Sequence, residues 1–276
     1  MRSTKIFQAF MPTRKRVLLV ALLSSLFVGC TSFVNKATFH PSPGESYDLA
    51  DFDTDIQRVT LKTADHVNIS SYFLPNPKAN KALLLFHGNA GNASDRLPEA
   101  EVFHSYGLNV LLMDYRGYGL SEGSPSEGGI YKDAAAGLAY LQAQGFRTEE
   151  IFLYGRSLGT TVAVELAQYH PYAGLILLSP LSSGKNVAKY RGISWLIPFQ
   201  NPFNSLEKIP KNTAPLLLVH GEQDRVLPIN MGQDLFAAAK EPKQFLAVKE
   251  GGHNDLLSRH ATLVYNAIQQ FIDPLN

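Results

Sequence analysis

Cysteine is almost absent from the sequence, and its single copy, Cys30, excludes a disulfide within the chain. An excess of either charge is missing too, because 25 Lys and Arg residues balance 24 Asp and Glu residues to a formal net charge of +1. No block of basic residues follows residue 16, so a nucleic acid is not an expected partner. Repeats and low-complexity tracts are also lacking, and 276 residues, 45% of them hydrophobic, suit one globular domain with a sizeable core.

Motifs that bind cofactors are missing as well. The sequence contains no Gly-x-x-x-x-Gly-Lys-Ser/Thr phosphate loop and no dinucleotide fingerprint. His87 and His220 have no partners at the spacing of metal ligands. We therefore expect neither a cofactor nor a metal ion.

The first 29 residues are typical of an export signal. Basic residues without any acid occupy residues 1–16, and an uncharged apolar run over 17–29 follows them. As a helix this run would be about 20 Å long, which is less than the roughly 30 Å of a hydrocarbon core. An uncleaved signal anchor is the alternative, because the run could extend to residue 34.

Cys30 stands directly after this run, in a pattern that resembles a bacterial lipobox. The segment Leu26-Phe-Val-Gly-Cys30 has the small residue before the cysteine, although Phe27 and Val28 are bulkier than usual. We predict that Cys30 is lipidated, and that residues 30–52 are a tether between a membrane and a catalytic domain over 53–276; the alternative is a stray cysteine after an ordinary signal. Several acyl chains would hold the protein stably at a membrane. The expected location is the outer membrane or another part of the cell envelope.

Short unbroken apolar runs recur along the rest of the chain, as expected for strands that are buried on both faces. After a hairpin over 57–74, these runs lie at 82–86, 110–113, 151–154, 175–178, 216–219 and 245–248. Helix-like stretches separate them, at 95–106, 129–144, 158–170, 230–240 and 255–272. The alternation predicts an α/β fold with a mostly parallel sheet and helices on both faces. In such sheets, sites form at the carboxyl ends of the strands.

The candidate nucleophile is Ser157, in the sequence Gly155-Arg-Ser-Leu-Gly159. A predicted strand precedes this Gly-x-Ser-x-Gly motif and a predicted helix follows it, which is the context that a nucleophile turn requires. The flanking glycines keep a sharp, strained turn open. The alternative is a serine that only caps the helix.

The candidate base is His253, which follows a predicted strand and two glycines and precedes the last helix. In this fold the catalytic residues follow each other in the order Ser, then Asp or Glu, then His. The other histidines after Ser157, which we interpret as structural or solvated, are His170, His220 and His260.

The candidate acid is Asp224, in the loop that follows the predicted strand 216–219. Glu222 is the first alternative, and Asp255, close to His253, is another candidate. The site needs a carboxylate here because it holds the imidazole in the tautomer that accepts the serine proton.

Two backbone N–H groups are expected to form an oxyanion hole. One belongs to Leu158, the residue after the nucleophile, and the other to Asn89, in the loop after the strand 82–86. The alternative for Asn89 is an ordinary Gly/Asn turn. We interpret 114–121 as a rim and packing loop without a catalytic role, and 181–214 as a small apolar lid, with a plain surface helix as its alternative.

Together these motifs resemble the α/β-hydrolase-domain proteins of the membrane-associated serine hydrolase group, which includes mammalian protein depalmitoylases and many bacterial lipoprotein homologues. The resemblance covers about residues 57–272 and rests on His-Gly-Asn at 87–89, Asp-Tyr-Arg-Gly-Tyr-Gly at 114–119, Gly-Arg-Ser-Leu-Gly at 155–159, Ser-Pro-Leu at 179–181, His-Gly-Glu-Gln-Asp at 220–224 and Gly-Gly-His-Asn-Asp at 251–255. It implies the α/β-hydrolase fold and the same triad and oxyanion donors. The depalmitoylases have a cysteine-rich N-terminus, whereas this chain has Cys30 alone, so their substrate does not carry over.

The sequence therefore predicts a serine hydrolase that cleaves carboxylic esters or thioesters, either in small molecules or in acylated substrates at a membrane. One alternative is a peptidase or amidase of the same fold, although such enzymes usually carry a large extra domain that this chain has no room for. The other is a non-catalytic binding module, which would require the loss of a catalytic residue.

Overall fold

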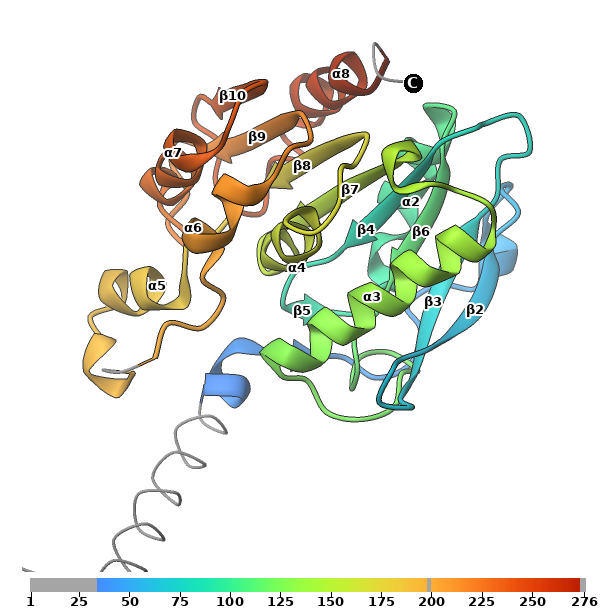
Figure 1. Ribbon diagram of the computed structural model, residues 1–276, viewed down its shortest axis with the longest axis horizontal. Coiled ribbons are helices and arrows are strands. Elements are labelled where there is room, and N and C mark those ends of the chain that lie inside the picture. Colours follow the sequence, from blue (N-terminus) through green and yellow to red (C-terminus); the bar gives the residue numbers. More distant parts are fainter. Residues whose placement is uncertain (1–33, 198–199, 274–276) are drawn as a thin grey trace, which may run out of the picture. The chain divides into compact units, whose positions relative to one another are not determined.

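A computed structural model describes residues 34–197 and 200–273 of the chain (Figure 1). The chain divides into two units, Met1–Thr38 and Phe39–Asn276, and the second unit contains the fold. This unit begins at Phe39, whereas the sequence predicts a domain from residue 53. The predicted export signal and Cys30 lie outside the described residues. Within the described ranges, no helix is both long and apolar enough to cross a bilayer.

An eight-stranded sheet forms the centre of the fold, in the order β10-β9-β8-β7-β4-β6-β3-β2. Its strands are β2 Gln57–Lys62, β3 Asn68–Leu74, β4 Ala82–Phe86, β6 Asn109–Met113, β7 Ile151–Arg156, β8 Gly174–Leu178, β9 Leu216–Gly221 and β10 Lys243–Val248. The pairs β2–β3 and β3–β6 are antiparallel, and all other neighbours are parallel. The predicted α/β fold with a mostly parallel sheet is confirmed.

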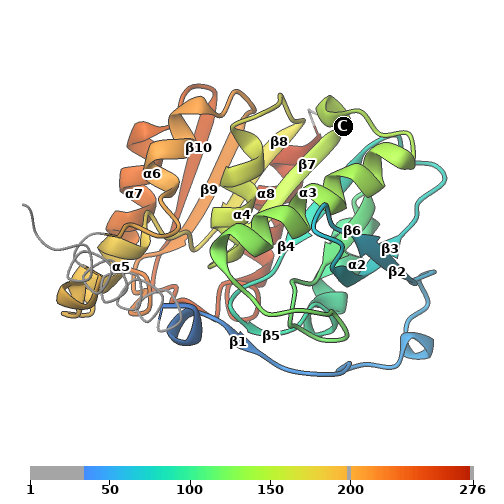
Figure 2. The ribbon, with the colours of Figure 1, turned by 60° about the horizontal axis from the view of Figure 1, so that its bottom comes forward.

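Helices cover both faces of the sheet (Figure 2). They are α2 Leu97–Ser105, α3 Glu127–Ala143, α4 Gly159–Ala167, α5 Gly184–Tyr190, α6 Ser205–Lys208, α7 Ile229–Ala238 and α8 Ala261–Ile272. Helices α3, α4 and α7 share one hydrophobic core with the sheet, and α2 and α8 share the other. The last helix begins at Ala261, later than the predicted residue 255, because a loop that carries His253 precedes it.

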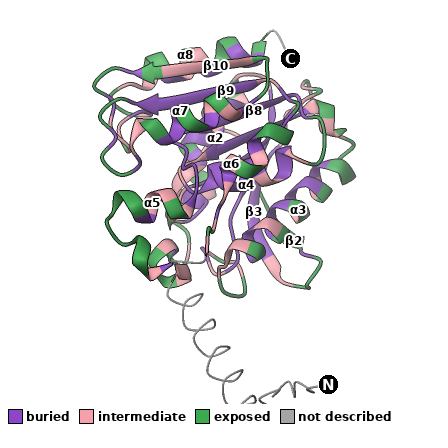
Figure 3. Cartoon of the chain, turned by 60° about the vertical axis from the view of Figure 1, so that its left-hand side comes forward, coloured by how far each residue is buried: buried purple, intermediate pink, exposed green. Residues whose placement is uncertain are grey.

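The unbroken apolar runs of the sequence follow from these two cores. On β4, Leu84 and Phe86 lie in one core, and Leu83 and Leu85 lie in the other. Successive side chains of a strand point to opposite faces, so a strand covered on both faces needs an apolar residue at every position. Figure 3 shows the central strands as buried along their length.

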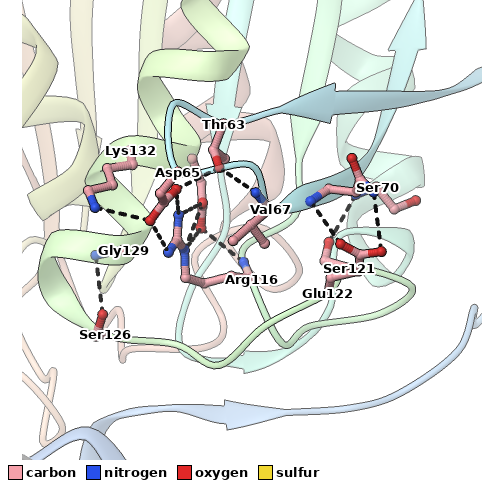
Figure 4. Close-up of polar contacts among 12 residues, drawn as sticks. Thr63, Asp65, Val67, Ser70, Arg116, Ser121, Glu122, Ser126, Gly129 and Lys132 are labelled. Atoms are coloured by element: carbon pink, nitrogen blue, oxygen red, sulfur yellow. Dashed lines mark hydrogen bonds and ion pairs between the residues drawn. The ribbon is translucent and has the colours of Figure 1, made fainter.

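A buried guanidinium joins the hairpin turn, the loop after β6 and α3 (Figure 4). The Arg116 Nη1 and Nη2 groups each donate to Asp65 at 3.0 Å, and Nε and Nη2 donate to Asp133 at 2.9 and 2.8 Å. The Asp133 side chain is fully buried. Burial raises the pKa of the Asp133 carboxyl, and the Arg116 hydrogen bonds oppose that rise without cancelling it. This cluster holds the loop 114–121 in place at the edge of the sheet that carries the candidate site.

Candidate active site

Ser157 lies on a sharp turn between β7 and α4, with a positive φ of 51° that non-glycine residues rarely adopt. Its N–H donates to the carbonyl of Leu178 at 2.9 Å, which ties the turn to β8. A Cβ added to Gly155 would lie 2.5 Å from the carbonyl oxygen of Gly159, and one added to Gly159 would lie 2.2 Å from that of Phe86. Both glycines of the motif are therefore required by close backbone contacts.

The structure brings together the three residues that the sequence predicts as a triad. The Nε2 atom of His253 lies 3.0 Å from the Ser157 hydroxyl oxygen. Its Nδ1 atom lies 2.7 Å from Oδ2 of Asp224. Because a carboxylate can only accept, Nδ1 carries the proton and Nε2 is the atom that accepts from the serine.

Asp224 is held in an arrangement that keeps it ionised. Its other oxygen, Oδ1, accepts from the N–H groups of Val226 and Leu227, both at 2.8 Å. Burial alone would raise the pKa of the Asp224 carboxyl, but the hydrogen bonds from His220 and His253 outweigh burial and hold that pKa well below its usual range. Among the described residues, the carboxylate paired with His253 is therefore that of Asp224.

The two alternative acids lie elsewhere. Glu222 is exposed. Asp255 accepts from the N–H of Gly252 at 2.7 Å, and thus closes the turn that leads into His253. Asp255 therefore supports the loop that carries His253.

His220 is a second imidazole at the acid, to which the sequence reasoning gave no role in the site. The ring is fully buried, and its Nε2–H donates to the carbonyl of Leu227 at 2.8 Å. The same nitrogen lies 3.4 Å from Oδ2 of Asp224. A Cβ on Gly232 would lie 2.5 Å from the His220 Nδ1 atom, so this glycine makes room for the ring. His220 therefore closes the acid loop.

The remaining histidines after the nucleophile stay away from the triad. His170 is exposed at the end of the α4 region, and His260 stands directly before α8. Neither shares a hydrogen bond with a triad residue in the described part of the chain.

The predicted oxyanion loop lies directly against the nucleophile. A Cβ on Gly88 would lie 3.5 Å from Cβ of Ser157, so the backbone leading to Asn89 approaches the Ser157 side chain closely. Leu158 precedes the first residue of α4, where helix N–H groups point away from the helix. Leu158 thus follows Ser157 directly, and Asn89 follows the glycine that contacts it.

Tyrosines of the loop 114–121 hold this oxyanion loop from behind. The Tyr115 hydroxyl donates to the carbonyl of His87 at 2.9 Å, and the Tyr118 hydroxyl donates to that of Asn89 at 2.8 Å. His87 is itself buried, and its Nε2 atom lies 3.0 Å from Oδ1 of Asp114. The sequence signal for this support was the position of two tyrosines after β6, at the same edge of the sheet.

The predicted lid, 181–214, forms short helices beside the acid loop. The Tyr190 hydroxyl donates to the carbonyl of Arg225 at 3.3 Å. Three apolar side chains of this segment, Tyr190, Ile193 and Trp195, are exposed, Trp195 to 72%. Within the described residues, no group of His, Cys, Asp and Glu side chains could hold a metal ion.

Comparison with known proteins identifies the fold family. A family model described as "Serine aminopeptidase, S33" matches residues 77–206. The chain is 33% identical to alpha/beta hydrolase domain-containing protein 17B of Homo sapiens, over 82% of this chain and 80% of that protein. The chain belongs to the α/β-hydrolase family.

Other α/β-hydrolase comparisons agree with this assignment. Protein bem46 of Schizosaccharomyces pombe is 34% identical, over 78% of this chain and 74% of that protein. Among solved structures, an esterase of Pyrococcus furiosus has a TM-score of 0.72 at 20% identity and covers 86% of this chain and 98% of its own. The resemblance stated from the sequence motifs is confirmed at the level of the α/β-hydrolase family.

Proposed function

We propose that this α/β-hydrolase is a serine hydrolase that cleaves carboxylic esters or thioesters of acyl chains through an acyl-enzyme on Ser157. The observation that carries the proposal is the continuous hydrogen-bonded path from the Ser157 hydroxyl through His253 to Asp224. Family membership and the esterase among the structural neighbours support hydrolysis as the reaction class.

In the proposed reaction, His253 Nε2 takes the proton of Ser157 while the serine oxygen attacks the substrate carbonyl. The ionised Asp224 stabilises the imidazolium that forms and keeps its ring oriented. The imidazolium then gives its proton to the departing alkoxide or thiolate. A water molecule, activated by the same imidazole, releases the acid and restores the serine.

Negative charge on the carbonyl oxygen would be received by the backbone N–H groups of Leu158 and Asn89. A donor of this kind is worth about 10²–10³ in kcat, because it is already oriented toward the charge that develops. The contact between the Gly88 position and Ser157 supports Asn89 as one of the two donors.

Acyl substrates at a membrane surface are proposed on two grounds. The first is the group of exposed apolar side chains on the segment that borders the acid loop. The second is the lipobox-like sequence at Cys30, because only residues 31–38 separate this cysteine from the compact unit. Even fully extended, a segment of this length spans at most roughly 30 Å, so a lipid on Cys30 would keep the enzyme close to the bilayer.

A peptidase or amidase is the second candidate, because the matching family model is described as a serine aminopeptidase. The chemistry would be the same up to the leaving group, which would be an amine. Between β8 and β9 the described residues contain only short helices, in contrast to the large additional domain expected for such enzymes.

The test uses the full-length protein in detergent with a fluorophosphonate probe, followed by mass spectrometry of the modified peptide. Labelling of Ser157 that is lost in His253→Ala would support the proposal. Hydrolysis rates over acyl esters, acyl thioesters and aminoacyl amides, each with Ser157→Ala as control, would separate the two candidates. Equal rates in the wild type and Ser157→Ala would refute both.

A further inference from the structure

Residues 39–46, which the sequence analysis assigned to a tether, form a strap along the oxyanion loop, 87–92. A two-residue strand within the strap, β1 His40–Pro41, pairs in parallel with β5 Ala90–Gly91. The His40 N–H donates to the carbonyl of Asn89 at 2.9 Å, and the Ser42 N–H donates to that of Gly91 at 3.0 Å. The strap therefore contacts the residue that supplies the proposed second oxyanion donor.

Further hydrogen bonds continue along the strap. Its residue Gly44 donates to the carbonyl of Gly119 at 3.1 Å, and Gly119 returns a bond to the carbonyl of Ser42 at 3.0 Å. The side-chain amide of Asn92 donates to two carbonyls of the strap, that of Ser42 at 3.2 Å and that of Gly44 at 3.0 Å. The N–H of Ser46 donates to the Ser94 hydroxyl at 2.7 Å. The strap is thus bound on one side to the oxyanion loop and on the other to the tyrosine-containing loop.

Phe39 anchors the start of the strap. Its side chain is 5% exposed and contacts the rings of Tyr118 and Phe203 edge-on, with centroid distances of 6.5 and 6.0 Å. Tyr118 is the residue whose hydroxyl bonds to the Asn89 carbonyl. One buried aromatic contact therefore links the strap, the lid segment and the support of the oxyanion loop.

From these contacts we infer that the strap is a positioning element of the active site, which holds Asn89 in the orientation that receives the oxyanion. The Asn89 carbonyl accepts from His40 and Tyr118 together, which holds the peptide plane between Asn89 and Ala90, directly after the residue whose N–H is the proposed donor. A loop that is held in place before the reaction stabilises the developing charge without reorganising. The inference rests on the proposed function, and it makes the backbone of the strap a support of the oxyanion loop that touches no substrate atom.

Proline substitutions in the full-length protein test the role of the strap, because proline removes the backbone N–H and can retain an extended conformation. The double variant His40→Pro/Ser42→Pro loses both donors to the oxyanion loop. Both side chains are exposed, so His40→Ala/Ser42→Ala is a matched control that keeps the N–H groups. Hydrolysis of a small soluble ester removes any influence of the membrane on the assay.

The proline variant is expected to lower kcat at least about fivefold and to leave KM within about twofold, because only the transition state carries the oxyanion. Its affinity for a trifluoromethyl ketone, which forms a tetrahedral adduct with an oxyanion, should fall by the same factor as kcat/KM. If the strap supported stability alone, the proline variant would have a lower melting temperature, and its kcat and ketone affinity relative to the wild type would be unchanged. The alanine control should match the wild type.

A folded proline variant with the kcat and ketone affinity of the alanine control would overturn the inference. Should the double variant not fold, Phe39→Ala replaces it, because this substitution removes only the aromatic anchor of the strap. Its kcat and ketone affinity are then compared with those of the wild type. Ser157→Ala separates the two proposals: if it is inactive while the strap variants behave as wild type, only the strap inference fails. Hydrolysis that does not depend on Ser157 would refute the proposed function instead.

Discussion

Replacing His220 by leucine is expected to lower kcat about 10- to 100-fold, by analogy with the loss of a group that orients a metal ligand through a hydrogen bond. The loss of kcat should not exceed roughly 10⁴-fold, which is the loss expected when the acid itself no longer holds the base in the right tautomer. His220 acts through Asp224 and touches no substrate atom, so KM should change by less than about twofold.

The structure also predicts a loss of stability in this variant. The His220 Nε2–H is the donor to the Leu227 carbonyl at 2.8 Å, in a residue that is 5% exposed. A buried carbonyl without its donor costs about 1–3 kcal/mol in the free energy of unfolding. His220→Gln is the matched control, since a glutamine amide can present an N–H group close to the position of Nε2.

The difference in unfolding free energy between the wild type and the leucine variant should depend on pH, because the pKa of Asp224 is lowered in the folded chain. A carboxyl group with a lowered pKa in the folded chain adds stability above its usual pKa, and this is lost as the pH falls through the lowered value. The stability that His220 adds through Asp224 should therefore be complete above about pH 4, the usual pKa of an aspartate, and shrink as the pH falls below it. Urea unfolding of the wild type and both variants at several pH values measures this trend.

Steady-state hydrolysis of a soluble ester near pH 8, with active sites counted by fluorophosphonate titration, measures the effect on kcat. The glutamine variant should retain most of the wild-type rate, and the leucine variant should not. A folded leucine variant with wild-type kcat would show that the Val226 and Leu227 N–H groups alone position Asp224.

Three further experiments test other parts of the structure. Asp224→Asn should lower kcat by about 10⁴ while Glu222→Gln retains the wild-type rate, and the reverse result in the same ester assay would reassign the acid. Arg116→Ala should lower the free energy of unfolding in urea by about 3 kcal/mol, because it leaves the buried Asp133 carboxylate without its partner; no change would mean that the site relaxes or takes up water. Gly155→Ala should abolish fluorophosphonate labelling, because a Cβ there would lie 2.5 Å from a carbonyl oxygen of α4, and normal labelling would refute the need for that close contact.

Much of the fold could be predicted because the buried strands of the sheet have a recognisable sequence pattern. The inner strands of the parallel part are covered on both faces, so each has the sequence of a short apolar run, and the predicted run 82–86 coincides with β4. Candidate site residues follow such runs because the carboxyl ends of parallel strands meet at one edge. That topology is what allowed residues as distant in sequence as Ser157 and His253 to be placed together.

The strap could not be predicted, because its contacts leave no side-chain pattern. Residues 39–46 contain His40, Pro41 and Ser42 as exposed residues, which is the composition of a linker. Their bonds to the oxyanion loop are made by the backbone, to residues about 50 positions away in the chain. Only the burial of Phe39 marks the segment, and one aromatic residue in a polar stretch is too weak a signal.

The acid was ambiguous in the sequence for a related reason. Glu222 and Asp224 lie in the same loop, and their order gives no physical preference. What separates them is the turn itself: the N–H groups of Val226 and Leu227 converge on one oxygen of Asp224 and leave the other for His253. His220 holds this turn through a hydrogen bond to the Leu227 carbonyl. Every residue has a backbone carbonyl, so the sequence does not indicate this partner.

The two halves of the site are supported by different parts of the chain, and this makes their contributions separable. The acid side is held locally, because His220, Asp224 and Leu227 belong to one strand and the loop after it. The oxyanion side is held by distant segments, the strap and the tyrosines after β6. Damage to the first half should change the pH profile of kcat/KM, because the imidazole that takes the serine proton is then oriented and stabilised differently. Damage to the second half should weaken the affinity for a tetrahedral ketone adduct in proportion to kcat/KM and leave the pH profile in place, so the pH profile identifies which half a given substitution has reached.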